Sequence, residues 1–495
     1  MVIMSSLMLV MLLAALDQTI VSTALPRIAS ELHGLSKLSW VATAYLLTSA
    51  ITTPIYGKIS DMFGRKKIFQ TAIVIFLVGS VLCGISQNMN ELVFSRALQG
   101  IGAGGLMSLV LAIVGDVIPP RQRGRYMGYF GAVFGIASVA GPLLGGFLTD
   151  ALSWRWVFFV NIPIGIIALA AVATRLHLPV HKREHKIDYL GASLLAAGSV
   201  CLLLASVWGG TTYDWISTQI IGLIAAGLAL GVAFVIREKY AAEPIIPMKL
   251  FKNDIFTVSV ILSFLAGIAM FASILYIPLY QQIVRGFSPT KSGLLMLPLV
   301  LGLLTASIIS GRLISKFGRY KIFPIFGTLM LALGLWMFSH LALNTSEWVL
   351  GAWMVVIGAG LGSFMQVMTL AIQNSVDRSQ LGTATSSATF FRSLGSSFGA
   401  AIFGTVLTSR LAIHLAQAFP HASSAASSLN LSSIQSGAAL SHLPPEASYK
   451  VMQAFVTSFH DMFLLAIPFA LLAFVAALFL RETPLSSTHE PVISE

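Results

Sequence analysis

The sequence predicts an all-α polytopic membrane protein, built from two six-helix bundles with a two-helix insert between them. The 495-residue chain is 56% hydrophobic and only 10% charged, whereas a soluble domain carries about 25% charged residues. Apolar runs long enough to span a membrane, which takes ~20 residues, recur about fourteen times. A basic loop between two of these runs returns in degraded form at the matching place in the second half of the chain. Composition, run length and repetition therefore predict the same fold class.

The expected helices follow the apolar runs in chain order. The first run is too long for the apolar core of a signal peptide and carries Asp17, so we interpret it as the first membrane helix. The fourteen helices are expected near residues 3–25, 38–57, 68–87, 92–115, 126–148, 157–174, 189–208, 218–236, 255–281, 292–310, 322–341, 348–372, 385–410 and 456–480.

These helices divide the chain into four parts. We expect an N-terminal bundle, a linker with two extra helices, a C-terminal bundle and a tail, at residues 1–175, 176–254, 255–481 and 482–495. The extra hairpin at 189–236 is expected outside the bundles, where it touches lipid and the edge of one bundle. The loop at 411–455 is unusually long and rich in Ala, Ser and His. We expect it on the external side, either partly helical or disordered.

The distribution of basic residues predicts the orientation of the chain in the membrane. The net charge is +11, from 30 Lys and Arg against 19 Asp and Glu. Three or four basic residues occur in each of the loops on one side, at 57–67, 121–125, 175–186, 237–252 and 312–321. Such loops remain in the cytoplasm. We therefore expect both termini on the cytoplasmic side of the cell membrane, and no nucleic acid as a partner.

The repeated loop predicts that the two bundles are homologous. It runs from Gly57 to Lys67, and its copy runs from Gly311 to Lys321 with Gly, Phe-Gly-Arg and the final Lys in register. In the helices that follow, Gly102-Ala103-Gly104 is likewise matched by Gly358-Ala359-Gly360 at nearly the same spacing. Parallel repeats of this kind are typical of one class of secondary transporter.

Asp17 and Arg96 are charged residues within expected membrane helices. A carboxylate at bilayer depth costs about 2.5–3.5 kcal/mol on insertion scales, so Asp17 must face protein or a wet cavity. Burial favours the neutral acid, which suits a proton carrier or a counter-charge for a cation. The alternative is a structural acid paired with a neighbouring helix. Arg96 either stabilises the ionised form of such an acid or extends to the external surface.

The basic loop contains residues suited to holding the bundles together at the cytoplasmic end. Gly57 and Gly64 permit tight turns and close helix approach. Asp61 can accept hydrogen bonds from free N–H groups at a helix N-terminus, where the helix dipole favours an anion. Arg65 can pair with Asp116, at the cytoplasmic end of the fourth helix. We expect these residues to form a latch that closes the cytoplasmic side.

The fifth helix is rich in glycine and contains Gly141, Pro142, Gly145 and Gly146. This composition weakens and bends a helix, and it also lets a neighbouring helix pack closely. The two interpretations are compatible.

A substrate cavity is expected near the membrane midplane between the bundles, with a mostly apolar wall and few polar groups. The candidates for its lining are Tyr45, Gln99, Met365, Gln366 and Arg392. The alternative is that they pack between helices and that Arg392 has a structural partner. Because acids are few, selectivity is expected to depend on shape and apolar contact rather than on charge pairing.

The sequence gives no indication of an enzyme, a metal site or a bound cofactor. The His residues show no metal-ligand spacing, and Cys83 and Cys201 lie inside apolar runs as packing residues. No Gly-rich phosphate-binding loop ending in Lys-Ser or Lys-Thr is present, so this chain contains no ATP motor. We expect a proton gradient to be the energy source.

The motifs resemble those of the major facilitator superfamily over essentially the whole chain. The loop at 57–67 is similar to the family signature between helices two and three, and Arg96 to Gly100 resembles its fourth-helix motif. Other residues resemble the antiporter motif of the exporter branches, with Ala137 in place of a usual Gly: Gly128, Ala137, Gly141, Pro142, Gly145 and Gly146. Leu16 to Pro26 and Trp154 to Pro163 resemble the fourteen-helix drug:proton antiporter branch.

The resemblance implies proton-driven export of amphipathic drugs, and hence antibiotic resistance, by a protein we expect to be monomeric. It implies that Asp17 is a proton or cation site and that Asp61, Arg65 and Asp116 form the latch. Relatives that handle divalent cations often carry extra acids in the last two helices, which here offer only Asp461. Monovalent lipophilic cations, zwitterions or neutral amphiphiles therefore fit better. The alternatives are export of an endogenous lipid or secreted metabolite, and a non-transporting sensor.

Overall fold

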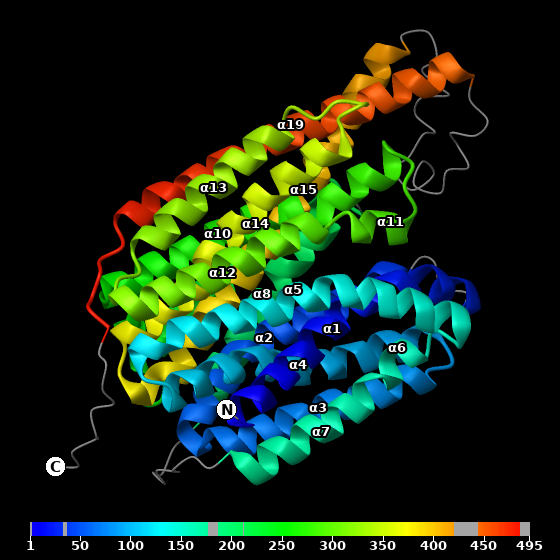
Figure 1. Ribbon diagram of the computed structural model, residues 1–495. Coiled ribbons are helices and arrows are strands. Elements are labelled where there is room, and N and C mark those ends of the chain that lie inside the picture. Colours follow the sequence, from blue (N-terminus) through cyan, green and yellow to red (C-terminus); the bar gives the residue numbers. More distant parts are fainter. Residues whose placement is uncertain (1, 33–36, 177–186, 211, 420–443, 486–495) are drawn as a thin grey trace, which may run out of the picture.

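The computed structural model describes residues 2–32, 37–176, 187–210, 212–419 and 444–485, and nearly all of them are helical (Figure 1). Each of the fourteen expected helices is present, the sixth as α6 and α7 and the tenth as α11 and α12. The helices are α1 Val2–Glu31, α2 Leu38–Phe63, α3 Arg65–Ile85, α4 Met89–Val117, α5 Pro120–Ala151, α6 Trp156–Phe159, α7 Asn161–Arg175, α8 Tyr189–Trp208, α9 Thr218–Tyr240, α10 Asp254–Ile283, α11 Pro289–Leu294, α12 Leu297–Phe317, α13 Ile322–Phe338, α14 Glu347–Ser375, α15 Leu381–Ala418 and α19 Pro445–Leu478.

Twelve helical segments of the described chain are long and apolar enough to cross a membrane. α13 is apolar but has only 17 residues. α2 has 26 residues and is not among the twelve; its threonines bind the backbone of α4. Thr48 Oγ1 donates to the Ala97 carbonyl at 2.8 Å, and Thr53 Oγ1 donates to the Gly104 carbonyl at 3.1 Å. With α2 and α13 included, the all-helical membrane fold predicted from the sequence is confirmed.

The helices form two bundles with separate apolar cores. α1–α7 surround one core that includes Phe76 and Leu106, and α10–α19 surround another that includes Phe403 and Phe459. In Figure 1 the first bundle, blue to cyan, lies below the second, green to red. We call the end where the α2–α3, α4–α5 and α12–α13 loops lie the basic end. α1 begins and α19 ends there.

Glycine packing shows that the bundles repeat each other. A Cβ at Gly100 would lie 2.1 Å from a side chain of α2, and one at Gly102 would lie 2.4 Å from the α3 backbone. In the second bundle a Cβ at Gly358 would lie 2.0 Å from the α12 backbone, and one at Gly360 would lie 2.8 Å from the α13 backbone. Gly358 therefore corresponds to Gly100. The alignment of Gly102 with Gly358 was wrong by two residues, because alternate glycines of a helix face different neighbours.

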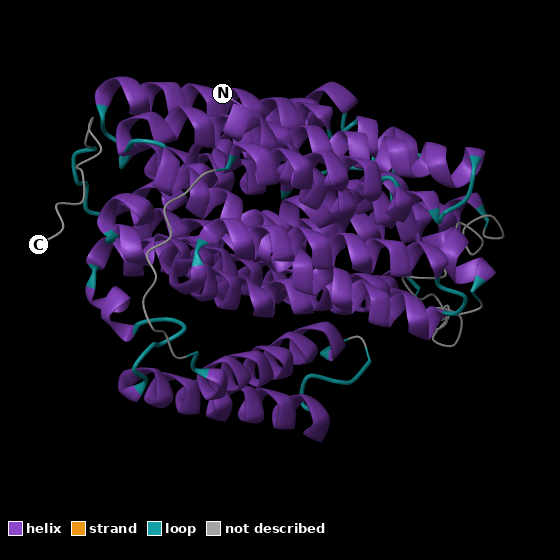
Figure 2. Ribbon diagram, turned by 90° about the horizontal axis from the view of Figure 1, so that it is seen from below, coloured by secondary structure: helices purple, strands orange, loops and turns teal. Residues whose placement is uncertain are grey.

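The inserted pair α8–α9 lies beside the main body (Figure 2) and bridges both bundles. One apolar cluster has members on α2, α8 and α15, namely Ala50, Leu203 and Phe390. The Trp40 ring of α2 stacks edge-on against Trp208 of α8, with centroids 5.9 Å apart. At the basic end, Lys58 Nζ lies 2.5 Å from the Glu243 carboxylate. The expectation of contact with one bundle edge was wrong: α8 covers the α2–α15 seam, where it buries apolar surface on both sides.

The last two helices extend beyond the expected membrane segments. α15 has 38 residues and α19 has 34, or about 57 and 51 Å at 1.5 Å per residue. The hydrocarbon core of a bilayer is only ~30 Å thick. Both ends of the loop expected at 411–455 are thus helical, while residues 420–443 lie outside the described residues.

The start of the expected tail is bound to the second bundle. The Glu482 carboxylate accepts hydrogen bonds from the backbone N–H groups of Tyr320 at 2.6 Å and Lys321 at 3.1 Å, next to the start of α13. Residues 486–495 of this tail lie outside the described residues.

Candidate functional site

A buried polar network surrounds Asp17, which lies in the middle of α1 and is fully buried in the first bundle. Its carboxylate accepts three hydrogen bonds of 2.8 Å, from Arg96 Nη1, Gln99 Nε2 and Asn161 Nδ2. Ser80 Oγ of α3 accepts from Gln99 at 3.1 Å and from Asn161 at 2.9 Å. The network thus joins α1, α3, α4 and α7 around one acid.

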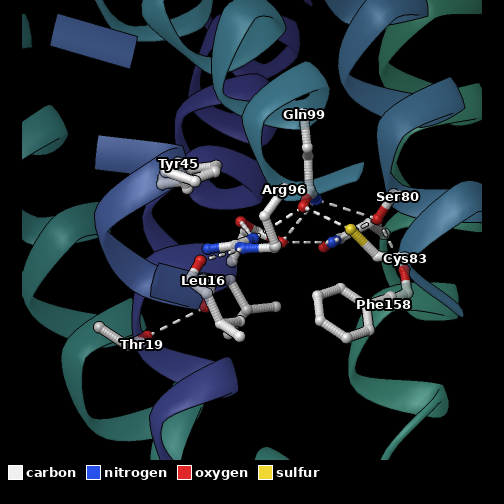
Figure 3. A network of polar contacts seen from close by, with 12 residues as sticks. Leu16, Thr19, Tyr45, Ser80, Cys83, Arg96, Gln99 and Phe158 are labelled. Atoms are coloured by element: carbon white, nitrogen blue, oxygen red, sulfur yellow. Dashed lines mark hydrogen bonds and ion pairs between the residues drawn. The ribbon is translucent and has the colours of Figure 1, made fainter. Parts of the chain in front are cut away.

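The Arg96 side chain is buried beside Asp17 and does not extend to the surface. Arg96 Nη1 also donates to Gln99 Oε1 at 2.7 Å. The guanidinium carbon lies 4.0 Å from the Tyr45 ring centroid and 5.8 Å from that of Phe158, with the two rings on either side of it (Figure 3). Removing one partner of a buried ion pair costs about 3–5 kcal/mol, so each charge depends on the other for its stability.

The glycines of α5 let it approach the helix that carries Asp17. A Cβ at Gly141 would lie 1.9 Å from Thr19 Oγ1, two residues beyond the acid, and one at Gly145 would lie 2.4 Å from the α1 backbone. A Cβ at Gly146 would meet nothing within 4 Å. Gly141 and Gly145 are therefore required for this helix contact, and Gly146 is not.

Gly141→Ala is expected to lower the thermal stability of the purified protein and to slow transport, because the added methyl group forces α1 and α5 apart. Overpacking of this kind typically costs about 1–3 kcal/mol. Gly146→Ala is the matched control in the same motif: it adds a methyl group into open space and should be neutral, or stabilising by up to ~1 kcal/mol. Equal melting temperatures and equal transport rates in the two variants would contradict the proposed role of the Gly141 contact.

At the basic end, Asp61 connects the end of α2 to the start of α15 in the other bundle. Its carboxylate accepts from the backbone N–H groups of Gly382 at 3.1 Å and Thr383 at 2.7 Å, and from Thr383 Oγ1 at 2.8 Å. Arg65 Nη2 lies 2.8 Å from Asp61 Oδ1, and Arg65 Nε contacts Asp116 at the end of α4. An anion at a helix N-terminus is stabilised by the helix dipole, so this cluster holds the two bundles together.

Two glycines give the latch its geometry. Gly57 lets α2 approach α15, since a Cβ there would lie 1.9 Å from Ser386 Oγ. Gly64, between α2 and α3, has a φ of 93°, which a residue with a side chain rarely adopts.

The copied loop closes the other seam between the bundles, where α12 meets α5. A Cβ at Gly311 would lie 2.2 Å from the Gly124 carbonyl oxygen. Ser315 Oγ accepts from the Arg125 backbone N–H at 3.2 Å, and Arg121 Nε donates to the Ser315 carbonyl at 3.2 Å. Ser315 stands where the first copy has Asp61, so it supplies no carboxylate. Charge-assisted hydrogen bonds are about twice as strong as neutral ones, so we expect the α2–α15 seam to be the stronger.

The structure does not bring the five candidate substrate residues into one site. Tyr45 and Gln99 are buried next to Arg96 in the first bundle. Met365 packs on the core of the second bundle, and Gln366 lines a small cleft between α5, α12 and α14. Arg392 is half-buried in α15 and forms no hydrogen bond or ion pair with the part of the chain that the structure describes.

Several residues in these sites were not expected from the sequence. Asn161 and Ser80 complete the Asp17 network, and Thr383 binds Asp61. Gln373, buried in α14, donates to the Leu111 carbonyl of α4 at 2.8 Å and so adds a contact between the bundles. Of these residues, only Asn161 was indicated by the sequence, because it lies in the Trp154 to Pro163 motif. The others are common polar residues in apolar helices, where periodicity assigns no partner.

The chain matches a known protein family over most of its length. Residues 7–400 match the family model of the Major Facilitator Superfamily. The chain belongs to this superfamily. It is therefore a multi-pass membrane transporter and not an enzyme, as the sequence motifs predicted.

The chain is similar to several bacterial members of the superfamily along nearly its whole length. It is 42% identical over 490 residues to an uncharacterized MFS-type transporter of Mycobacterium tuberculosis, covering 99% of this chain and 70% of the relative. It is 39% identical over 505 residues to the multidrug transporter protein MdtP of Bacillus subtilis, covering 98% and 93%. It is 37% identical over 491 residues to multidrug resistance protein 3 of Bacillus subtilis, covering 98% and 96%.

Solved structures show the same fold at low sequence identity. The human organic anion transporter MFSD10 (TETRAN) superposes with a TM-score of 0.64 at 16% identity, covering 95% of this chain and 99% of that one. The proton:xylose symporter XylE gives a TM-score of 0.60 at 16% identity, covering 98% and 96%. The superfamily fold expected from the sequence is confirmed.

Proposed function

We propose that this transporter is a proton-coupled exporter of amphipathic compounds, with its basic end in the cytoplasm. Relatives that are named multidrug transporter and multidrug resistance protein support drug-like substrates. The Lys- and Arg-rich loops support the orientation, since such loops remain in the cytoplasm. The observation that carries proton coupling is the Asp17 carboxylate, which is fully buried and bound by donors from two other helices.

Protonation of Asp17 changes the forces between helices of the first bundle. The ionised carboxylate holds Arg96, Gln99 and Asn161 by charge-assisted hydrogen bonds, each worth about 1.5–3 kcal/mol. A proton on either oxygen removes that charge and leaves the Arg96 guanidinium without its counter-ion. Asn161 Oδ1 is buried and has no hydrogen-bond partner among the described residues. It offers an acceptor for the new O–H group if the amide turns.

This change at Asp17 has a route to the seams between the bundles. α1 carries Thr19, whose Oγ1 donates to the Ala137 carbonyl of α5 at 3.0 Å, and α5 forms one seam with α12. One charge moving down 100 mV releases about 2.3 kcal/mol, which is comparable to one of the charge-assisted bonds. Binding and loss of a proton at Asp17 can therefore shift the balance between two bundle arrangements in alternating access.

Proteoliposomes test the proposed function directly. The purified chain is reconstituted, a pH gradient is imposed, and the movement of amphipathic dyes and of a labelled phospholipid is recorded together with internal pH. We expect uphill dye transport that stops when a protonophore collapses the gradient, and proton flux when dye is added. Dye transport that is insensitive to the protonophore would contradict proton coupling. Transport of the phospholipid but not of the dyes would contradict drug export and indicate lipid export instead.

A further inference from the structure

A half-buried arginine of the second bundle has no partner among the described residues. Arg392 is eleven residues from the start of α15, or about 16 Å along the helix axis, which is roughly half the thickness of the ~30 Å hydrocarbon core. The other buried arginines all have partners in the described chain: Arg96 pairs with Asp17, Arg65 pairs with Asp61, and Arg123 donates to backbone carbonyls. Arg392 has no carboxylate or other hydrogen-bond partner among the described residues.

The face of α15 that bears Arg392 is directed towards the middle of the molecule. Thr385 and Ser396 lie on the same helical face, at i−7 and i+4. Thr385 Oγ1 accepts from Gln373 of α14 at 3.3 Å. A Cβ at Gly267 of α10 would lie 2.5 Å from the Arg392 carbonyl and 3.3 Å from Ser396 Oγ. Since Gln373 also binds the α4 backbone, this face lies where α4, α10 and α14 meet.

The neighbouring aromatic residues face elsewhere, so the guanidinium is not simply covered by them. Phe390 packs in the apolar cluster shared with α2 and α8, and Phe391 packs against Phe251 and Phe256 near the basic end of α10. Arg392 is half-buried rather than fully enclosed. A cation at this depth is costly without an anion, and no described residue supplies one.

We propose that Arg392 binds the acidic group of the transported compound, so that amphiphiles with a carboxylate are preferred over otherwise identical neutral ones. This inference rests on the proposed function as an exporter of amphipathic compounds and specifies its substrate class. The planar guanidinium offers two parallel N–H donors to a carboxylate. The same positive charge disfavours a compound that carries only a cation. This assignment therefore replaces the expectation that selectivity depends on shape and apolar contact rather than on charge pairing.

Direct binding tests this assignment. The full-length protein in lipid nanodiscs is titrated with 1-pyrenebutyrate and with its methyl ester, which differ only in the acidic group, and empty nanodiscs supply the background. The parent is expected to bind the carboxylate at least tenfold more tightly than the ester. Arg392→Gln should remove this preference by weakening carboxylate binding about tenfold and leaving ester binding within twofold. Arg392→Lys should fall between them, because it keeps the charge and loses the bidentate geometry.

Arg410→Gln is the matched control. This arginine lies on the same helix, is 53% exposed and is 3.7 Å from Asp461, so its loss should leave both affinities unchanged. An equal loss of affinity for both probes in Arg392→Gln, or tighter binding of the ester than of the carboxylate by the parent, would overturn the proposal. If Arg392→Gln does not fold, the proposal is tested by the parent's preference for the carboxylate over the ester and by the smaller preference expected in Arg392→Lys. Binding is measured without a pH gradient, so a failure of proton-driven transport would overturn the proposed function and leave this site standing.

Discussion

Asp17→Asn is expected to abolish pH-gradient-driven efflux while the protein still folds in the membrane. Asn keeps the size of Asp but cannot ionise, so the difference between the protonated and ionised network is lost. The Arg96 guanidinium is left without a counter-ion, which costs about 3–5 kcal/mol, so the melting temperature should also fall. The measurement is dye efflux from proteoliposomes under an imposed pH gradient, compared with dye exchange without a gradient, which should persist.

Two further variants separate a coupling role of Asp17 from a structural one. Glu31→Gln removes an acid from the exposed end of the same helix and should leave coupling intact. Adding Arg96→Gln to Asp17→Asn removes the unpaired cation, so the double variant should recover part of the lost stability but not the coupling. Uphill efflux by Asp17→Asn at the parent rate would remove Asp17 from the mechanism, whatever its effect on stability.

Asp61→Asn is expected to shift the transporter towards the state that is open at the basic end. The substitution removes the charge that faces the N-terminus of α15 and pairs with Arg65. Charges near helix ends contribute about 0.3–2 kcal/mol, and a loss of this size changes a two-state population several-fold. Turnover should slow, and substrate affinity should change little, because the latch lies at one end of the molecule and the expected substrate region lies at its middle.

Distances across the basic end test this expectation. Spin labels at Lys67 and Ser379, which are exposed at this end of the two bundles, should show a larger population of long distances in Asp61→Asn than in the parent. Asp254→Asn is the matched control, because Asp254 pairs with Arg481 at 2.7 Å within the second bundle and crosses no seam. Identical distance distributions in Asp61→Asn and the parent would show that Asp61 does not hold the gate.

The sites show where sequence reasoning succeeds and where it stops. Asp17 was found because an acid inside an apolar run is costly wherever its partners lie. Two other members of its network were not assigned, namely Asn161, which binds Asp17, and Ser80, which accepts from Gln99 and Asn161. Nothing local indicates which polar residues of α3 and α7 face α1. The chemistry of Asp61 at a helix N-terminus was expected from its position in the loop. The identity of that helix, α15, was not, because it lies in the other half of the chain.

The glycines of α4 and α14 correctly predicted that the two bundles repeat each other, but the residue-by-residue alignment was wrong. The pairing of Gly102 with Gly358 indicated a repeat, and both residues do pack closely on neighbouring helices. The structure instead pairs Gly358 with Gly100, since Gly100 faces α2 and Gly358 faces the corresponding helix α12 of the second bundle. A two-residue shift turns a helix position by about 200°, so similar letters can face different neighbours.

The sequence by itself determined the fold class, the number and order of the membrane helices, the uneven distribution of basic loops and the presence of a buried acid. Each of these follows from the transfer of a single segment between water and lipid, which depends on local composition. Only the tertiary structure decided that α8 bridges both bundles, that Asp17 is enclosed within one bundle and that Arg392 has no partner within the described part of the chain. These features depend on which helix faces meet, and packing between residues far apart in the chain decides that.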